Sequence, residues 1–195
     1  MPSPSLPSAE AAGAFTRNID LVGEEGFRRL RAARVAVIGL GGVGSHAAVA
    51  LARAGVGHVR LVDFDKVTAS GLNRHAVARL EDVGQPKVEV VGRQLLAIAP
   101  EMTVEQQAVF FHEETVEQIL GGGLNMLVDA IDSFTPKVVL LASCVARGLA
   151  VVSSMGASAR VDPTLMRVGD LSETRVCPWP GPYARPWPRR ASARA

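Results

Sequence analysis

Short apolar runs rich in β-branched residues alternate along the chain with longer segments of helical spacing. Residues 34–39, with the sequence Arg-Val-Ala-Val-Ile-Gly, are typical of a buried strand. The alternation predicts an α/β protein with one Rossmann-like domain, whose mostly parallel sheet carries helices on both faces. Strands are expected over residues 34–39, 58–63, 102–111, 126–131 and 149–154, and helices over residues 21–31, 45–54, 87–99, 113–120 and 135–147.

The two ends of the chain lack this alternation. Residues 1–14 are rich in proline, serine and alanine without a basic start, so we predict a disordered leader rather than a secretory signal. Residues 15–33 are predicted to form an N-terminal helical arm, residues 34–170 the Rossmann-like domain, and residues 171–195 an irregular tail. Because the tail holds both tryptophans and five of the twelve prolines, we hypothesise that a frameshift produced it.

Composition narrows the class of protein further. Hydrophobic residues make up 48% of the chain, yet no uncharged apolar stretch reaches the roughly 18 residues of a membrane span. The last eighteen residues hold four arginines and no acid, so the remainder is slightly acidic and gives no bulk support for nucleic-acid binding. Two distant cysteines exclude a disulfide framework, and Cys144 is expected in the core. We expect a cytoplasmic protein with no membrane partner.

A glycine-rich loop, Gly39-Leu40-Gly41-Gly42-Val43-Gly44, joins the first predicted strand to the next helix. Glycine lets the backbone approach a phosphate closely, and the helix N-terminus adds free N–H donors and partial positive charge. Asp63 follows about twenty residues later at the end of the second strand, where an acid suits hydrogen bonding to a ribose hydroxyl. Gly39, Gly41, Gly42, Gly44 and Asp63 are therefore predicted to bind a nucleotide.

Further polar residues distinguish between the possible nucleotides. A plain dinucleotide site does not explain Asp65, Asn73, Arg74, Lys87 and Asp132. A triphosphate does, since Arg74 and Lys87 can neutralise phosphate oxygens and Asp132, after a strand, can hold Mg²⁺. Asp65 has a second interpretation, the capping of the following turn. The predicted ligands are therefore ATP and Mg²⁺, which makes residues 34–170 an ATP-binding domain.

The order of these motifs resembles the ubiquitin-activating-enzyme-like adenylyltransferases, and within them the bacterial tRNA threonylcarbamoyladenosine dehydratases. The resemblance covers roughly residues 14–177, and five ordered motifs are far more specific than one. The similar segments are Phe15-x-Arg17, Leu21-Val22-Gly23-Glu24, Gly41-Gly42-Val43-Gly44-Ser45, Asp63-x-Asp65, Asn73-Arg74, Gln85-Pro86-Lys87, Ala130-Ile131-Asp132-Ser133 and Asp162-Pro163-Thr164.

The resemblance implies a role for each matching residue. The glycine loop would hold the ATP phosphates, Asn73, Arg74 and Lys87 would line the triphosphate, Asp132 would coordinate Mg²⁺, and Asp63 would bind ribose. Arg17 would reach the nucleotide of a partner subunit, since family members are homodimers. Arg74, Lys87, Asp132 and Arg17 are thus the expected catalytic residues. The implied reaction is adenylation of the carboxylate of threonylcarbamoyladenosine in tRNA, followed by ring closure, with a sulfur-relay protein as a further partner.

Three other functions stay open. The first is an adenylyltransferase for a ubiquitin-like sulfur-carrier protein, although the Cys-x-x-Cys zinc ligands usual in those enzymes are absent. The second is an NAD-dependent oxidoreductase. The third is an inactive nucleotide-binding remnant, because family members continue well beyond this point and neither Cys144 nor Cys177 matches the cysteine of their later part.

Overall fold

The computed structural model describes residues 13–156 and 161–171. Most of the predicted leader, almost all of the predicted tail and Cys177 lie outside these residues. The chain divides into two units, residues 1–154 and 155–195. In the second unit, a single 3₁₀ turn (Pro163–Leu165) begins where the Asp162 carboxylate accepts hydrogen bonds from the N–H and hydroxyl of Thr164.

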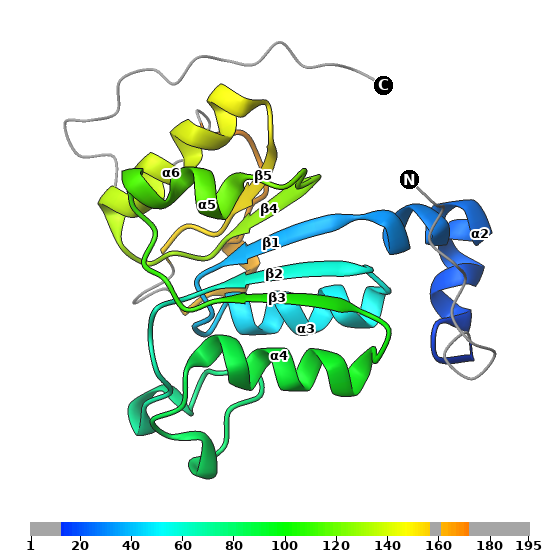
Figure 1. The fold of residues 1–195 in the computed structure, drawn as a ribbon, viewed down its shortest axis with the longest axis horizontal. Coiled ribbons are helices and arrows are strands. Elements are labelled where there is room, and N and C mark those ends of the chain that lie inside the picture. The colour runs from blue at the N-terminus through cyan, green and yellow to red at the C-terminus, as the bar shows by residue number, and fades with distance from the viewer. Residues whose placement is uncertain (1–12, 157–160, 172–195) are drawn as a thin grey trace. The chain divides into compact units, whose positions relative to one another are not determined.

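The first unit is built on a five-stranded parallel sheet, as the alternating pattern predicted (Figure 1). Its strands are β1 (Arg34–Ile38), β2 (His58–Val62), β3 (Thr103–Gln107), β4 (Met126–Asp129) and β5 (Ala150–Ser153). The spatial order is β3-β2-β1-β4-β5, so β1 and β2 lie inside the sheet between neighbours on both sides. Because all strands are parallel, their carboxyl ends lie at the same end of the sheet, where the loops after β1, β2 and β4 meet.

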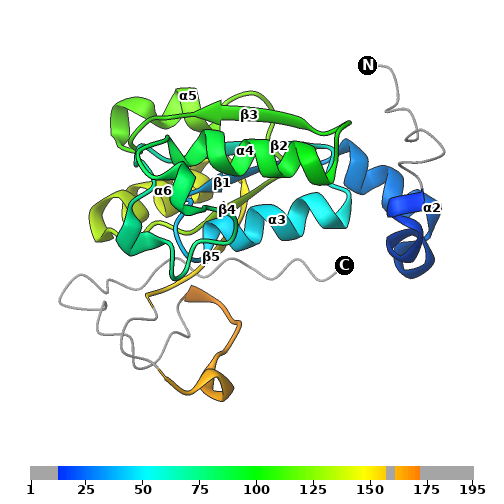
Figure 2. The same cartoon turned by 90° about the horizontal axis from the view of Figure 1, so that it is seen from below.

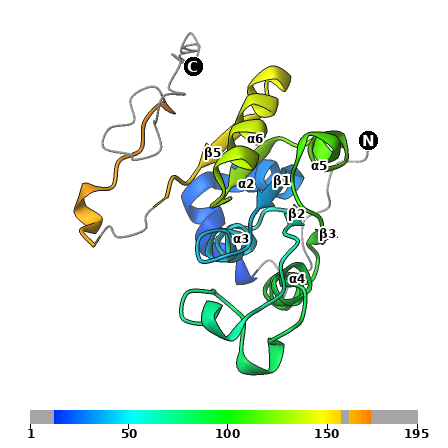
Figure 3. The same cartoon turned by 90° about the vertical axis from the view of Figure 1, so that its left-hand side faces the viewer.

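Helices cover both faces of the sheet, which confirms the predicted Rossmann-like α/β architecture (Figures 1 and 3). They are α2 (Thr16–Ala32), α3 (Gly44–Ala54), α4 (Lys87–Ile98), α5 (Val116–Leu120) and α6 (Phe134–Arg147). Helices α3 and α4 lie side by side on one face, and α5 and α6 lie on the other (Figures 1 and 2). No helix within the described ranges is long and apolar enough to cross a membrane.

Alternate residues of β1 belong to two separate hydrophobic clusters, one on each face of the sheet. Val35 and Val37 pack toward α3 and α4, whereas Ala36 and Ile38 pack toward α5 and α6. Cys144 is fully buried in the second cluster, as expected, and burial raises the pKa of its thiol to about 11. The continuous apolar run of β1 thus reflects a strand covered on both faces.

Helix α2 packs at the amino end of the sheet. It begins five residues before the predicted start and is kinked at Gly23, whose φ of 73° interrupts the helical backbone. The ring centroids of Phe15 and Phe27 are 5.4 Å apart, and a Cβ on Gly55, just before β2, would collide with the Phe27 ring. Because β1 starts directly after α2, the helix lies at the end of the sheet opposite the glycine loop (Figure 1).

Besides the start of α2, the predicted end of β4 at residue 131 and the predicted start of α5 at residue 113 are wrong. Two further boundaries differ for reasons of pairing and helix geometry. Strand β3 ends at Gln107 rather than at residue 111, because its ladder partner β2 ends at Val62, opposite Gln107. Helix α6 begins at Phe134, and Pro136 occupies its first turn, where the missing N–H has no intrahelical acceptor to lose.

Candidate nucleotide site

The glycine loop lies at the carboxyl end of β1 and is held close to the turn after β4. Gly39 has a φ of 87°, and a Cβ there would lie 2.7 Å from the carbonyl oxygen of Ala130. A Cβ on Gly44 would in turn collide with the carbonyl of Gly39. The backbone N–H groups of Gly41, Gly42 and Val43 have no acceptor among the described residues. Glycine is therefore required for the backbone path, and the path leaves donors open for an anion.

Asp63 joins the glycine loop to the end of β2. Its carboxylate is only 8% exposed, and Oδ2 accepts a hydrogen bond of 2.6 Å from the N–H of Leu40. Its Oδ1 accepts a hydrogen bond of 2.8 Å from the N–H of Asp65. Each carboxylate oxygen has further lone pairs, so a ribose hydroxyl would add to these bonds rather than replace them.

Lys87 is brought to the same place from the start of α4. Its Nζ lies 2.7 Å from Asp65 Oδ2 and 3.7 Å from Asp63 Oδ2. In addition, the N–H of Lys87 donates to the carbonyl of Asp65. The exposed Asp65 carboxylate thus holds the ammonium group beside the glycine loop, where it is half-buried and accessible.

Arg74 approaches the loop from the crossover segment between β2 and α4. A Cβ on Gly42 would lie 3.2 Å from Arg74 Cδ, so the aliphatic part of the side chain passes over this glycine. The guanidinium donates to the carbonyl of Ser70 at 3.1 Å and to Asn73 Oδ1 at 3.2 Å, and both Asn73 and Arg74 are exposed. Neither bond pairs the charge of the guanidinium with an acid.

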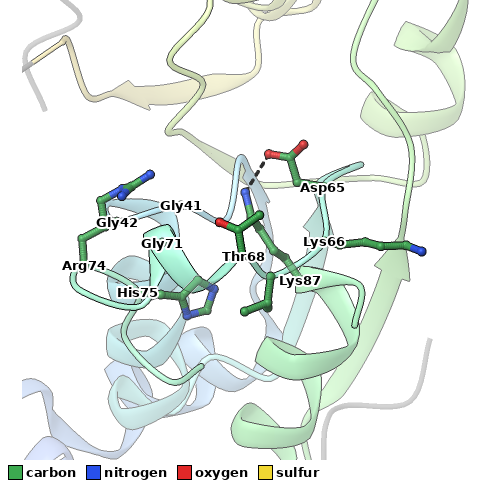
Figure 4. A pocket seen from close by; sticks show the side chains of 10 residues that line it. Gly41, Gly42, Asp65, Lys66, Thr68, Gly71, Arg74, His75 and Lys87 are labelled. Carbon is green, nitrogen blue, oxygen red and sulfur yellow. Dashed lines mark hydrogen bonds and ion pairs between the residues drawn. The ribbon is translucent and has the colours of Figure 1, made fainter. Parts of the chain in front are cut away.

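Five of these residues, Gly41, Gly42, Asp65, Arg74 and Lys87, border one cleft of about 250 Å³. Figure 4 shows Arg74 on one side of Gly41 and Gly42, and Lys87 with Asp65 on the other. The lining residues are Gly41, Gly42, Asp65, Lys66, Val67, Thr68, Gly71, Arg74, His75 and Lys87. The structure therefore brings Gly41, Gly42, Asp65, Arg74 and Lys87 to one cleft, and adds Lys66, Thr68 and His75, which sequence reasoning missed.

The other predicted site residues are absent from this lining: Gly39, Gly44, Asp63, Asn73, Asp132 and Arg17. The first four are tied to the glycine loop or to Arg74, whereas Asp132 and Arg17 are not. Asp132 is exposed on the turn between β4 and α6, and no hydrogen bond or ion pair ties it to another described residue. The turn itself reaches the glycine loop, because the carbonyl of Ala130 abuts Gly39. Arg17 lies on α2 at the amino end of the sheet, so the structure does not bring it to the cleft of its own chain.

A buried ion pair, also missed from the sequence, lies under the turn that carries Asp132. Asp129 is 0% and Lys137 3% exposed, and Lys137 Nζ lies 2.5 Å from Asp129 Oδ2. Ser153 donates to the same oxygen, and Asp129 Oδ1 accepts from the N–H of Ile131 at 3.0 Å. The sequence did hold a signal, since Lys137 falls on the apolar stripe of its helix, and a lysine there requires an acidic partner.

A second cluster of charges, which we call the Glu105 cluster, consists of Arg34, His58, Arg60 and Glu105. Glu105 Oε1 lies 2.8 Å from His58 Nε2 and 3.2 Å from Arg34 Nη2, while Oε2 accepts from Arg60 Nε at 2.5 Å. Arg60 Nη1 also donates to the carbonyls of Ile119 and Gly121 at 2.7 Å each. The cluster thus ties α5 to the inner strands.

Protonation in the Glu105 cluster follows from burial and neighbouring charges. Burial and the charge of Arg34 lower the pKa of His58 below its ordinary value. Burial alone would raise the pKa of Glu105, but the hydrogen bond and charge of Arg60, with His58 and Arg34, lower it. The lowered pKa of Glu105 keeps its carboxylate charged beside Arg34 and Arg60, and the lowered pKa of His58 favours a neutral imidazole.

Comparison with known proteins agrees with this fold. Residues 15–186 match the sequence model of the ThiF family. The chain is 43% identical over 164 residues to the tRNA threonylcarbamoyladenosine dehydratase of Bacillus subtilis (strain 168), which is 84% of this chain and 65% of the relative. It is 37% identical over 131 residues to a sulfur carrier protein adenylyltransferase of Thermus thermophilus, 67% of this chain and 48% of that relative.

Solved structures carry the same architecture. The crystal structure of Escherichia coli tRNA N6-threonylcarbamoyladenosine dehydratase in complex with ATP superposes with a TM-score of 0.84 and 36% identity, covering 87% of this chain and 70% of that one. The predicted Rossmann-like fold is confirmed by this match. The chain spans about two thirds of the length of the Bacillus subtilis relative.

Proposed function

The chain belongs to the ThiF family, and we propose that it uses ATP to activate a carboxylate as an acyl-adenylate. The proposed substrate is N6-threonylcarbamoyladenosine beside the anticodon of a tRNA, which the reaction dehydrates to a cyclic form. We further propose that the protein works in the cytoplasm as a homodimer and has a sulfur-relay protein as a partner. Two relatives named above, one of them solved with ATP, support the substrate and the nucleotide.

One observation carries the proposal: the glycine loop, Arg74 and Lys87 border a single cleft. The N–H groups of Gly41 and Gly42 are open to a ligand, and Arg74 and Lys87 add two cations from later in the chain. Together they provide more positive charge than a dinucleotide needs. A triphosphate that gives up pyrophosphate needs this charge, because negative charge builds up on the leaving group. The NAD-dependent alternative does not account for Arg74 and Lys87.

The proposed chemistry has two steps. A carboxylate oxygen of the substrate forms a bond to the α-phosphorus of ATP, and the bond from that phosphorus to the bridging oxygen breaks, so pyrophosphate leaves. The side-chain nitrogen of the substrate then attacks the activated acyl carbon and loses its proton, AMP leaves with the former carboxylate oxygen, and a ring closes. The net change is the loss of one water molecule, driven by ATP.

The residues of the chain divide this work by position. Lys87, which Asp65 holds beside the loop, and Arg74 would stabilise phosphate charge. Asp63 would bind ribose through its remaining lone pairs. Asp132 fits Mg²⁺, because it is an exposed carboxylate without a partner in the described part of the chain, and Mg²⁺ often takes one carboxylate together with phosphate oxygens. The ion would supply charge neutralisation of the triphosphate.

Arg17 is proposed to act across a homodimer. Helix α2, which carries it, lies at the opposite end of the sheet from the glycine loop of the same chain. A contribution of Arg17 to a nucleotide therefore requires the cleft of a second copy. Mixing an Arg17→Ala variant with an Arg74→Ala variant tests this, because heterodimers would regain one intact site and about half of the activity per mixed dimer.

ATP–pyrophosphate exchange is the test of the proposed function. We expect exchange with tRNA that carries threonylcarbamoyladenosine, and its loss in Arg74→Ala. Arg79→Ala is the matched control, since Arg79 lies on the same crossover segment but contacts only Glu81 with its guanidinium. Exchange only with a sulfur-carrier protein would replace this proposal by the adenylyltransferase. ATP binding without any exchange would favour an inactive remnant, and binding of NAD but not ATP would overturn the assignment.

A further inference from the structure

His75 lies in the wall of the nucleotide cleft, and the proposed function gives it no role. Its Nδ1 accepts hydrogen bonds from two backbone N–H groups, those of Val77 at 3.3 Å and Ala78 at 3.1 Å. Its Nε2 is buried and has no hydrogen-bond partner among the residues that the structure describes. A ring whose Nδ1 accepts twice carries its proton on Nε2 and is neutral.

The turn that His75 closes also fixes the backbone of Arg74. The N–H groups of Arg74 and His75 both donate to the carbonyl of Gly71 at 3.2 Å. Ala76 donates its N–H to Ser45 Oγ at 3.0 Å, which joins the turn to the first turn of α3. Figure 4 shows the consequence: the ring of His75 turns toward Thr68 and Lys87, while the side chain of Arg74 extends along Gly42.

The charges around His75 favour its neutral form. Burial is the largest effect that lowers the pKa of His75, and the nearby Lys87 and His46 lower it further, while Asp63 and Asp82 oppose them. Protonation would place a hydrogen on Nδ1, which would then face two N–H donors. Both acceptor bonds would be lost, and the cation would lie near Lys87.

His46 also contacts the turn, but its contact survives protonation. Its Nε2 lies 3.2 Å from the carbonyl oxygen of Arg74, and a protonated ring still donates to that oxygen. Among the described histidines near the cleft, His75 therefore has the contact that acid breaks. Acid is therefore expected to disturb the turn through the ring of His75 and not through the ring of His46.

We propose that His75 is a positioning residue: its neutral ring, through Nδ1, holds the 71–78 turn that keeps Arg74 against the glycine loop, and protonation of the ring weakens nucleotide binding. The inference rests on the proposed function for the identity of the nucleotide, and it adds a pH dependence that ATP binding alone does not require. The ring contacts the turn, and Arg74 contacts the phosphates.

Two isosteric variants separate the two ring nitrogens. In His75→Asn, Oδ1 takes the place of Nδ1 and accepts from the following N–H groups as in an Asx turn, without titrating. In His75→Gln, the amide takes the place of Nε2 and leaves the Val77 and Ala78 N–H groups without their acceptor. The measurement is the dissociation constant of ATP from pH 5.5 to 8.0 at constant ionic strength, without tRNA.

At pH 7.5, we expect His75→Asn to bind ATP within about threefold of the wild type, and His75→Gln to bind about tenfold more weakly, which corresponds to roughly 1.4 kcal/mol. At pH 5.5, His75→Asn should bind more tightly than the wild type. The ratio of the two proteins is the readout, because the titration of ATP itself cancels from it. A ¹⁵N spectrum of the wild-type ring should show the Nε2–H tautomer at pH 7.5.

Parallel pH profiles of the wild type and His75→Asn would overturn the inference, and so would equal ATP binding by the Asn and Gln variants. Thermal unfolding at pH 7.5 reports whether each variant is folded, and a mutation that acts only on stability would change the midpoint without changing the pH profile of binding. Loss of ATP–pyrophosphate exchange with intact ATP binding would remove the proposed function and leave this inference standing. Parallel pH profiles of ATP binding, together with intact ATP–pyrophosphate exchange, would remove this inference and leave the proposed function standing.

Discussion

The nucleotide cleft and the Glu105 cluster use the same types of side chain in opposite ways. In the Glu105 cluster, one carboxylate is surrounded by Arg34, His58 and Arg60, and Arg60 also satisfies two carbonyls. In the cleft, Lys87 is paired with Asp65, but among the described residues the guanidinium of Arg74 donates only to uncharged oxygens, and Arg74 is exposed. Charges that neutralise one another hold a fold together, whereas charges left without a counter-charge are available for a ligand.

The Asp129–Lys137 pair extends this contrast, because it supports the turn that contacts the glycine loop and yet resembles the Glu105 cluster. Both charges are almost fully buried, and Ser153 and the N–H of Ile131 complete the carboxylate's hydrogen bonds. The pair is thus a support for the turn before Asp132 rather than a ligand group. Its removal should affect stability first.

The largest effect is expected from Lys137→Met, which leaves a fully buried carboxylate without its cation. We expect a loss of about 3–5 kcal/mol in the free energy of unfolding, measured by urea denaturation. Asp129→Leu combined with Lys137→Met removes both charges and should recover most of the loss. A single variant that unfolds like the wild type would contradict the structural role of the pair.

Arg60→Met tests the Glu105 cluster itself. The variant loses the ion pair with Glu105 and leaves the carbonyls of Ile119 and Gly121 without a donor, so we expect a loss of about 2–4 kcal/mol in stability. The ATP affinity of the folded variant, measured at low temperature, should stay within about twofold because the cluster does not reach the cleft. A strong loss of ATP affinity in the folded variant would contradict the distinction between the Glu105 cluster and the nucleotide cleft.

Arg74→Ala should give the opposite result to Arg60→Met, a loss of ATP affinity with little change in stability. The affinity for ATP should fall about 10–100-fold, which is 1.4–2.7 kcal/mol, because an unpaired cation beside the glycine loop is removed. Stability should change by no more than about 0.5 kcal/mol, since the side chain is exposed. Calorimetric titration gives the first quantity and urea denaturation the second, with Arg79→Ala as the control for both.

The smallest effect is a pH dependence of stability from the Glu105 cluster. The pKa of His58 is lower in the folded chain than its ordinary value of 6.5, so its contribution is complete above about pH 6.5 and is lost as the pH falls toward the folded value. The pKa of Glu105 is also lowered, from 4.5, so its contribution persists until the pH falls below about 4.5. His58→Gln should flatten the first decline only, in unfolding midpoints measured from pH 8 to 4.

Local pattern was enough to predict the elements and much of the site. Gly41, Gly42, Asp65, Arg74 and Lys87 border one cleft, because a strand–loop–helix unit and parallel strands fix where the loops gather, and their roles toward ATP stay predictions. The assignments of Asp63 to ribose, Asp132 to Mg²⁺ and Arg17 to a partner's nucleotide stay predictions. Residues 1–12 and 172–195, which make up most of the predicted leader and tail, lie outside the described structure.

The sequence by itself determined which segments become strands and helices and where glycine is required, because these depend on side-chain period and on backbone conformation over a few residues. Only the tertiary structure decided which charges meet. Arg60 and Glu105 are 45 residues apart and are paired by strand register, while Asp129 finds Lys137 through the return of α6 over the sheet. That packing decides which cation lies beside each carboxylate. It therefore also decides which charges stabilise the fold and which are left for a ligand.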